Sequence, residues 1–70
     1  MELDAVARGV VNVYYPLKGY GFIRRTTGKD LFFYRDAFTA EELIVEGSIV
    51  EFKVEDTEKG PRAVNIARIG

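Results

Sequence analysis

The stretch Lys18-Gly19-Tyr20-Gly21-Phe22-Ile23 places aromatic side chains and glycines at alternating positions. Successive side chains of a β-strand point to opposite faces, so this order predicts a strand with its aromatic residues on one face and mostly glycine on the other. Glycine within a strand is typical of tight coiling or of the close approach of another strand. The stretch therefore predicts a strongly curved sheet whose aromatic side chains face outward.

Short apolar stretches separated by turn residues recur along the rest of the chain. They predict five strands, over residues 8–15, 18–25, 30–35, 48–55 and 62–69. A helical turn over 40–45, with Thr39 as its N-cap, is the only helix expected. Five short strands in 70 residues predict an all-β fold in the form of a closed or nearly closed barrel, because closure removes unpaired sheet edges.

Alternation also assigns a core face and an outer face to each strand. The residues predicted to face the core are Ile23, Leu31, Phe33, Val50, Phe52, Val54, Val64 and Ile66. The residues that then share the outer face are Tyr20, Phe22, Phe32 and Tyr34, flanked by Lys18, Arg24 and Asp30. Exposed aromatic patches with a charged rim typically mark binding sites, and this one is suited to stacking unpaired bases. The alternative is a second apolar layer covered by the connection over 36–47.

The composition limits the possible functions. The chain has 70 residues, a net charge of −1, no cysteine and no histidine, which argues against a disulfide scaffold, a cysteine-ligated metal and a histidine base. No apolar run is long enough to span a membrane and no secretory leader is visible, so we expect a soluble cytoplasmic protein. Residues 18–35 carry a net charge of +4 and residues 36–58 a net charge of −7. This polarity matters more for attracting a polyanion than the total charge does.

Four segments also carry a family resemblance. Lys18–Ile23 resembles the first ribonucleoprotein motif of cold-shock domains, and Lys29-Asp30-Leu31-Phe32-Phe33-Tyr34 resembles the stretch leading into the second. Gly47 with Val50-Glu51-Phe52, and Lys59–Ile66, resemble two later segments of that family. The resemblance extends from Gly9 to Arg68. It implies a five-stranded antiparallel Greek-key OB-type barrel that binds single-stranded RNA and DNA, formed by one domain over 1–70 with a core at 8–69 and an N-terminal extension at 1–7.

The resemblance also implies roles for individual residues. The base-stacking positions would be Tyr20, Phe22, Phe32 and Tyr34. Lys18 would lie beside them at the nucleic-acid backbone, Asp30 would accept hydrogen bonds from base edges, and Lys59 would lie near the nucleic acid from the last hairpin.

The chain departs from the family pattern at several of these places. Val13 stands where the family has an exposed tryptophan, and Asn12 replaces the preceding lysine. Tyr15 would replace the lost ring if it turns outward, and otherwise would pack on Pro16. Arg35 replaces an aromatic residue and would stack as a guanidinium plane or pair with phosphate.

Two arginines in the second strand also depart from the family, because Arg24 and Arg25 replace residues that are usually uncharged or acidic. Arg24 follows the outer aromatics and is a candidate phosphate contact. Strict alternation places Arg25 on the opposite face.

These features predict a module that binds single-stranded RNA and DNA with low sequence specificity, as an RNA chaperone or in the regulation of transcription or translation. No cofactor, membrane or small-molecule substrate is expected, and a monomer is expected with a dimer left open. The alternative is a protein-interaction barrel with weakened nucleic-acid binding, which the changes at Val13 and Arg35 motivate. An enzyme is not expected, since the acid pairs Asp30 with Asp36 and Glu41 with Glu42 lack a nucleophile or base partner.

Overall fold

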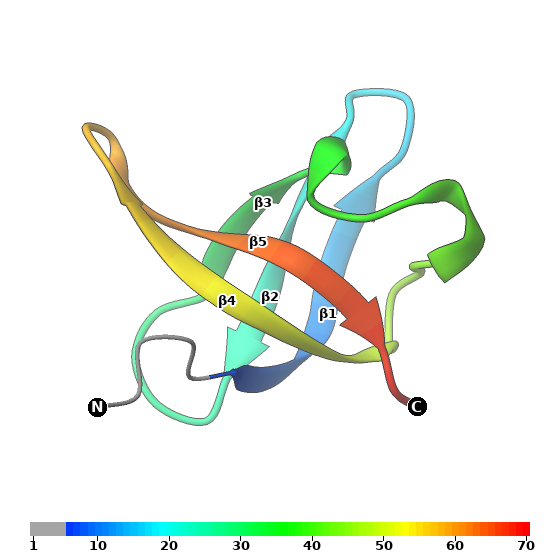
Figure 1. Ribbon diagram of the computed structural model, residues 1–70, viewed down its shortest axis with the longest axis horizontal. Coiled ribbons are helices and arrows are strands. Elements are labelled where there is room, and N and C mark those ends of the chain that lie inside the picture. The colour runs from blue at the N-terminus through cyan, green and yellow to red at the C-terminus, as the bar shows by residue number, and fades with distance from the viewer. Residues whose placement is uncertain (1–5) are drawn as a thin grey trace.

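The computed structural model describes residues 6–70, which form a closed barrel of five strands (Figure 1). The strands are β1 (Ala7–Tyr15), β2 (Tyr20–Arg25), β3 (Leu31–Tyr34), β4 (Ile49–Thr57) and β5 (Gly60–Arg68). Each predicted strand is present, with ends that differ by at most two residues. Residues 1–5 of the predicted N-terminal extension lie outside the described residues.

The strand order around the barrel is β1-β2-β3-β5-β4, and β4 pairs with β1 to close it. Four of these pairings are antiparallel, whereas β3 and β5 meet in parallel through Phe32 and Arg62. The predicted all-β, five-stranded OB-type barrel is confirmed, with one parallel strand pair among four antiparallel pairs.

The connection between β3 and β4 contains two 3₁₀ turns, η1 (Arg35–Ala37) and η2 (Ala40–Glu42). The second is the predicted helical turn, shortened to three residues, and Thr39 precedes it without a side-chain cap hydrogen bond. Phe38 from this connection has ring contacts with Tyr14 and Phe33, on the core side of the sheet. The connection therefore covers the core. Among the described residues, no ring contact joins it to the outer aromatics, which argues against the alternative of a covered second layer.

Most of the predicted core is confirmed. The predicted residues that are at most 3% exposed are Ile23, Leu31, Phe33, Val50, Phe52 and Ile66. Val54 was wrongly assigned to the core and is 45% exposed, because β4 and β5 run past the barrel as a projecting hairpin (Figure 1). Val64 is only half-buried, and Ala63 takes the inward position instead.

The reason for the error at Val64 is a β-bulge in β5. Glu51 pairs with Ala67 and Lys53 pairs with Val64, so β5 contributes one more residue than β4 to this interval. Asn65 there has φ 52°, a left-handed conformation that asparagine tolerates better than most residues. The extra residue changes which side chains face inward, so Ala63 and Ile66 share the core.

Gly21 explains why the second strand carries glycine beside aromatics. A Cβ atom at this position would collide with the carbonyl oxygen of Val13 and lie 2.8 Å from the ring of Phe33. The glycine thus lets the backbone of β1 and a core ring approach β2 closely. Gly19 differs from the prediction, because it lies in the turn before β2 with φ 79° and is not an inward strand position.

A second bulge, in β1, decides where that strand's aromatic side chains point. Val11 pairs with Ile23 and Val13 pairs with Phe22, which leaves Asn12 as the extra residue. Strict alternation from the buried Val11 would turn Val13 inward, but the bulge places it opposite an outer aromatic instead.

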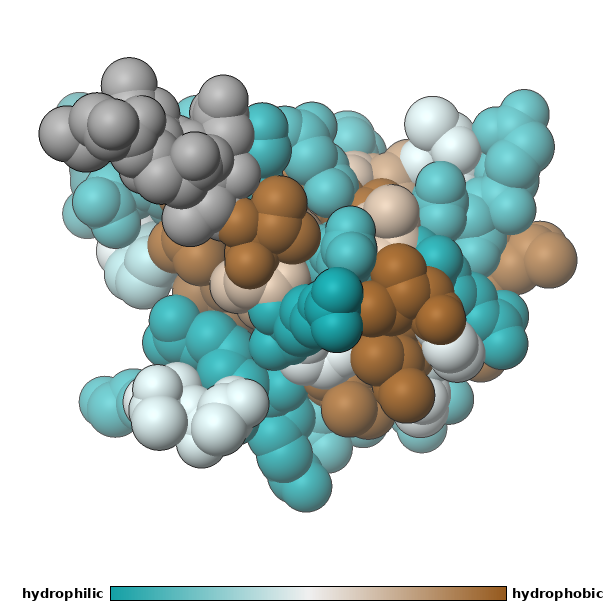
Figure 2. Space-filling model, turned by 60° about the horizontal axis from the view of Figure 1, so that its bottom comes forward, coloured by the Kyte–Doolittle hydropathy of each residue, from teal (hydrophilic) through white to brown (hydrophobic). Residues whose placement is uncertain are grey.

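The surface is largely polar, with apolar side chains gathered in separate patches when the molecule is seen from the lower side of Figure 1 (Figure 2). Val10 and Ile49 are cross-strand partners and Ile69 hydrogen-bonds to Ile49, and each of the three is between 41% and 45% exposed. Such exposed aliphatic side chains are ordinary in a small domain. Within residues 6–70, no helix has the length and apolar character needed to cross a bilayer.

Candidate nucleic-acid interface

Five aromatic side chains on β1, β2 and β3 form one continuous cluster on the outside of the barrel. We call Tyr15, Tyr20, Phe22, Phe32 and Tyr34 the aromatic surface. Cross-strand pairing aligns Tyr15 with Tyr20, Tyr20 with Tyr34, and Phe22 with Phe32. The four outer aromatics predicted from alternation are thus brought together, and Tyr15 joins them.

The rings of the aromatic surface contact one another at their edges and faces. Ring centroids are 5.6 Å apart for the stacked pair Tyr20 and Phe32, and 4.6 Å apart for the perpendicular pair Phe32 and Tyr34. Phe22 lies 5.7 Å from Phe32 with its ring tilted by 69°. These distances are typical of stabilising aromatic pairs, so the rings hold one another in place before any ligand binds. Tyr34 remains 42% exposed, and the rings of Tyr20, Phe22 and Phe32 are half-buried.

Tyr15 and Lys18 form one end of the aromatic surface. The ring of Tyr15 meets Tyr20 edge-on at 5.3 Å, and the ammonium of Lys18 lies 5.6 Å from the centre of the Tyr15 ring. Of the two orientations open to Tyr15, the structure thus shows the outward one. Tyr14, one residue earlier, stacks on the buried Phe33 instead.

Arg35 holds the turn between β1 and β2. Its Nη1 donates to the carbonyl oxygen of Pro16 at 3.1 Å, and its guanidinium lies 3.7 Å from the position of a Cβ on Gly19. The backbone N–H of Arg35 also donates to the Gly19 carbonyl oxygen at 2.8 Å. The structure therefore places Arg35 beside the Tyr20 end of the surface, where it fixes a turn.

Arg24, Asn12 and Asp30 form a polar network at the opposite end of the aromatic surface. Arg24 Nη2 donates to Asn12 Oδ1 at 3.1 Å, and Asn12 Nδ2 donates to Asp30 Oδ2 at 2.9 Å. All three side chains are exposed. Arg25 lies on the other face, as alternation predicts, and its Nε donates to the Lys29 carbonyl oxygen at 3.0 Å.

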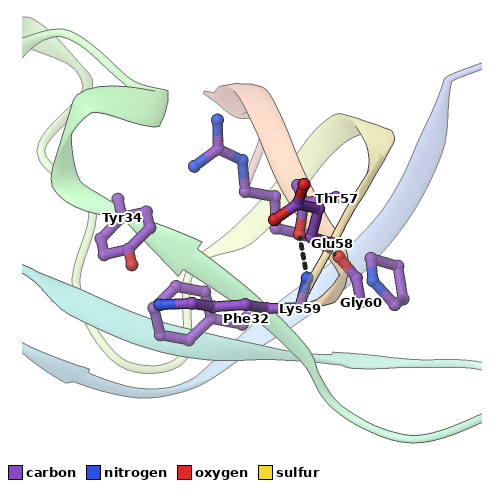
Figure 3. A pocket seen from close by; sticks show the side chains of 8 residues that line it. Phe32, Tyr34, Thr57, Glu58, Lys59 and Gly60 are labelled. Carbon is purple, nitrogen blue, oxygen red and sulfur yellow. Dashed lines mark hydrogen bonds between the residues drawn. The ribbon is translucent and has the colours of Figure 1, made fainter.

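A pocket of about 690 Å³ lies between the aromatic surface and the projecting hairpin (Figure 3). Its walls are Phe32, Tyr34, Thr57, Glu58, Lys59, Gly60, Pro61 and Arg62. Lys59 extends from the hairpin toward Phe32 in this view. Thr57 Oγ1 donates to the Gly60 carbonyl oxygen at 2.6 Å and accepts from the Lys59 backbone N–H at 3.2 Å, which fixes the turn that presents the lysine.

Arg62 is a basic pocket residue that was not proposed from the sequence as a binding residue. Its guanidinium carbon lies 5.6 Å from the centre of the Tyr34 ring, and it forms an ion pair with Glu55 at 3.2 Å. Arg62 reaches the aromatic surface through the parallel pairing with Phe32. The available signal was its place three residues after Lys59 in a family-like segment, but only the closure of the barrel brings it to Tyr34.

The described residues carry no visible metal centre. Within residues 6–70, no three acidic, cysteine or histidine side chains are grouped closely enough to hold a metal ion.

Comparison with known proteins places these features in a family. The model of the "Cold-shock" DNA-binding domain matches residues 7–69. The Retron Se72 cold shock-like protein of Salmonella heidelberg (strain 579083-10) is 47% identical over 64 residues, which cover 87% of this chain and 96% of that protein. Cold shock-like protein CspC of Shigella flexneri is 40% identical over 68 residues, 93% and 99% of the two chains. The major cold shock protein of Streptococcus pyogenes serotype M1 is 36% identical over 66 residues, 91% and 98% of the two chains. Together with the barrel and its outer aromatics, these matches show that the chain belongs to the cold-shock domain family of nucleic-acid-binding proteins.

Proposed function

We propose that this protein binds single-stranded RNA and DNA with low sequence specificity by stacking unpaired bases on the aromatic surface. The observation that carries the proposal is the continuous set of five rings, whose neighbouring centroids lie 4.6 to 6.3 Å apart. Every base has a π-face, so stacking tolerates any sequence, and each stack contributes about 1–3 kcal/mol.

Basic side chains at the rim supply the phosphate contacts. Lys18 lies at the Tyr15 end of the aromatic surface, and Lys59 and Arg62 line the pocket at the hairpin. A strand that crosses the rings from the β1–β2 turn to the hairpin would meet a cation at each end. Neutralising phosphates releases counterions, so the affinity should fall as salt concentration rises.

The action of the protein on RNA would be passive. Bases stacked on the aromatic surface are withdrawn from pairing, so binding shifts the equilibrium of a hairpin toward its open form without an energy source. This is the action of an RNA chaperone, and on a transcript it would also influence transcription or translation. We propose that the protein acts in the cytoplasm as a monomer.

Titration of the protein with a short oligothymidine tests the proposal. The chain contains no tryptophan and four tyrosines, three of which belong to the aromatic surface, so tyrosine fluorescence reports directly on it. We expect saturable quenching, weakened in Phe22→Ala and Phe32→Ala variants that still melt cooperatively near the parent temperature. If these folded variants bind as well as the parent, or if the parent does not bind at all, a protein-interaction barrel becomes the better explanation.

The chaperone activity needs a separate measurement. An RNA hairpin labelled with a fluorophore and a quencher should brighten when the protein is added, and the protein concentration at half-maximum should follow the affinity for the open strand. Binding to the open strand without any change in the labelled hairpin would leave a nucleic-acid-binding protein that is not a chaperone.

A further inference from the structure

The polar network of Asn12, Arg24 and Asp30 lies one row along the strands from two rings of the aromatic surface. Arg24 follows Phe22 by two residues on β2, and Asp30 precedes Phe32 by two residues on the approach to β3. Two residues along a strand span about 7 Å, which matches the width of a base. A base stacked on either ring would therefore direct one edge toward the network.

The network leaves specific hydrogen-bonding groups available. Asn12 bridges the other two side chains, because its amide oxygen accepts from Arg24 and its amide nitrogen donates to Asp30. Within residues 6–70, Arg24 and Asp30 form no direct ion pair, so both charged groups remain available to a ligand. Each carboxylate oxygen can accept more than one hydrogen bond, so Oδ1 and the second lone pair of Oδ2 in Asp30 are left for a ligand, together with the Nε and Nη1 groups of Arg24.

We propose that Arg24 and Asp30 read the Watson–Crick edge of a guanine stacked on Phe22 or Phe32, with Asn12 as the positioning residue that holds them apart. This inference rests on the proposed function, since the base must first be stacked. The Asp30 carboxylate accepts from N1–H and the N2 amino group of guanine, and the Arg24 guanidinium donates to O6.

The chemistry of the four bases explains the choice. Guanine presents two neighbouring donors beside one acceptor, which matches a carboxylate beside a guanidinium. Adenine and cytosine present a single exocyclic donor on that edge. Thymine and uracil present one donor between two carbonyl oxygens, and the second carbonyl would face the carboxylate. The site thus favours guanine at one position within a surface that otherwise tolerates any base.

The test compares short oligothymidine with the same strand carrying one central guanine, or one central inosine, which lacks the N2 amino group. We expect guanine to tighten binding about tenfold and inosine to give an intermediate affinity. In Arg24→Ala, Asp30→Ala and Asn12→Ala, the ratio of the two affinities should fall to about one, and Asn12→Gln should restore part of it. Arg25→Ala, which removes the same charge from the opposite face, should keep the parental ratio.

The outcomes separate the inference from the proposed function. If the parent binds oligothymidine and gains nothing from guanine, the inference is overturned and the stacking function stands. If guanine tightens binding but the three network variants keep the ratio, another part of the surface reads the base and the inference is again overturned. Failure of the parent to bind any strand would overturn both. Each variant is compared only after its thermal melt shows a folded barrel.

Discussion

The guanidinium of Arg62 lies over the ring of Tyr34, with 5.6 Å between the guanidinium carbon and the ring centre. The same guanidinium is paired with Glu55 at 3.2 Å, so an aromatic residue of β3 and a carboxylate of β4 share one cation. Both partners are partly solvent-exposed, and the energy of each contact in the free protein is therefore modest. Because Arg62 lines the pocket, its pairing with Glu55 should affect how strongly it attracts a phosphate.

Arg62→Gln and Glu55→Gln should change nucleic-acid affinity in opposite directions. Removing the guanidinium deletes a cation at the end of the aromatic surface, so the affinity for oligothymidine should fall and the salt slope should decrease by about 0.7 for one lost phosphate contact. Removing the Glu55 carboxylate frees Arg62 and deletes a repelling charge, so the affinity should rise. Titrations at several salt concentrations check both effects, and equal affinities in the two variants would show that the hairpin end does not meet the strand.

Val13→Trp should tighten binding to oligothymidine about tenfold. Val13 pairs with Phe22 on the outer side of the bulge, so an indole there would extend the aromatic surface by one stack, about 1–3 kcal/mol. Ile69→Trp is the matched control, since Ile69 is exposed beside Ile49, outside the aromatic surface. A similar gain in both variants would mean that an added indole binds anywhere on the barrel.

Stacking and charge should respond differently to salt. Phe22→Ala and Phe32→Ala should each weaken binding by the same factor at low and high salt, because stacking releases no counterions. Lys59→Ala should instead lower the salt slope by about 0.7. Arg8→Ala removes the same charge from a residue that pairs with Glu51 on the β1–β4 side, and it should leave the slope near the parental value. Equal slopes for Lys59→Ala and Arg8→Ala would count against a phosphate contact at the hairpin.

Gly21→Ala should destabilise the barrel more than Gly47→Ala. The new Cβ at Gly21 would meet the β1 backbone and a core ring at 2.8 Å, and overpacking of this kind typically reduces the free energy of unfolding by about 1–3 kcal/mol. Gly47 has φ 90° and nothing within 4 Å of a Cβ, so alanine there should cost only the backbone strain of about 1 kcal/mol. Urea unfolding of both variants measures the difference in the free energy of unfolding. A larger loss in Gly47→Ala would show that β1 can shift to accommodate the new methyl group at low cost.

Short apolar stretches between turn residues were sufficient to predict the five strands, and alternation was sufficient to predict the outward position of the four aromatics on β2 and β3. It failed where one strand carries an extra residue, because a bulge exchanges the two faces and leaves no simple mark in composition. Val64 was misassigned for this reason. Val54 was misassigned because alternation does not say where a hairpin leaves the barrel.

The candidate site was only partly visible for a related reason. Local pattern places Phe22 beside Tyr20, but Arg62 reaches Tyr34 only through the pairing of β3 with β5, which are separated in the sequence by the β3–β4 connection and by β4. The Asn12 bridge between Arg24 and Asp30 likewise joins three segments that no local pattern connects. The contacts that could not be predicted from the sequence are thus those made by the β3–β5 pairing and by the bulge at Asn12.

The bulge at Asn12 interrupts the alternation of side chains between the two faces of β1. It therefore determines which changes of length this strand can accept. After that single additional residue, Tyr14 enters the interior and Tyr15 reaches the surface. Loss of the Asn12 or Val13 codon would remove the bulge and leave a regular ladder in which Tyr14 still faces the interior and Tyr15 still faces the ligand. This point of β1 should therefore accept the loss of one residue during evolution, whereas the same loss within a regular stretch of strand would exchange its two faces.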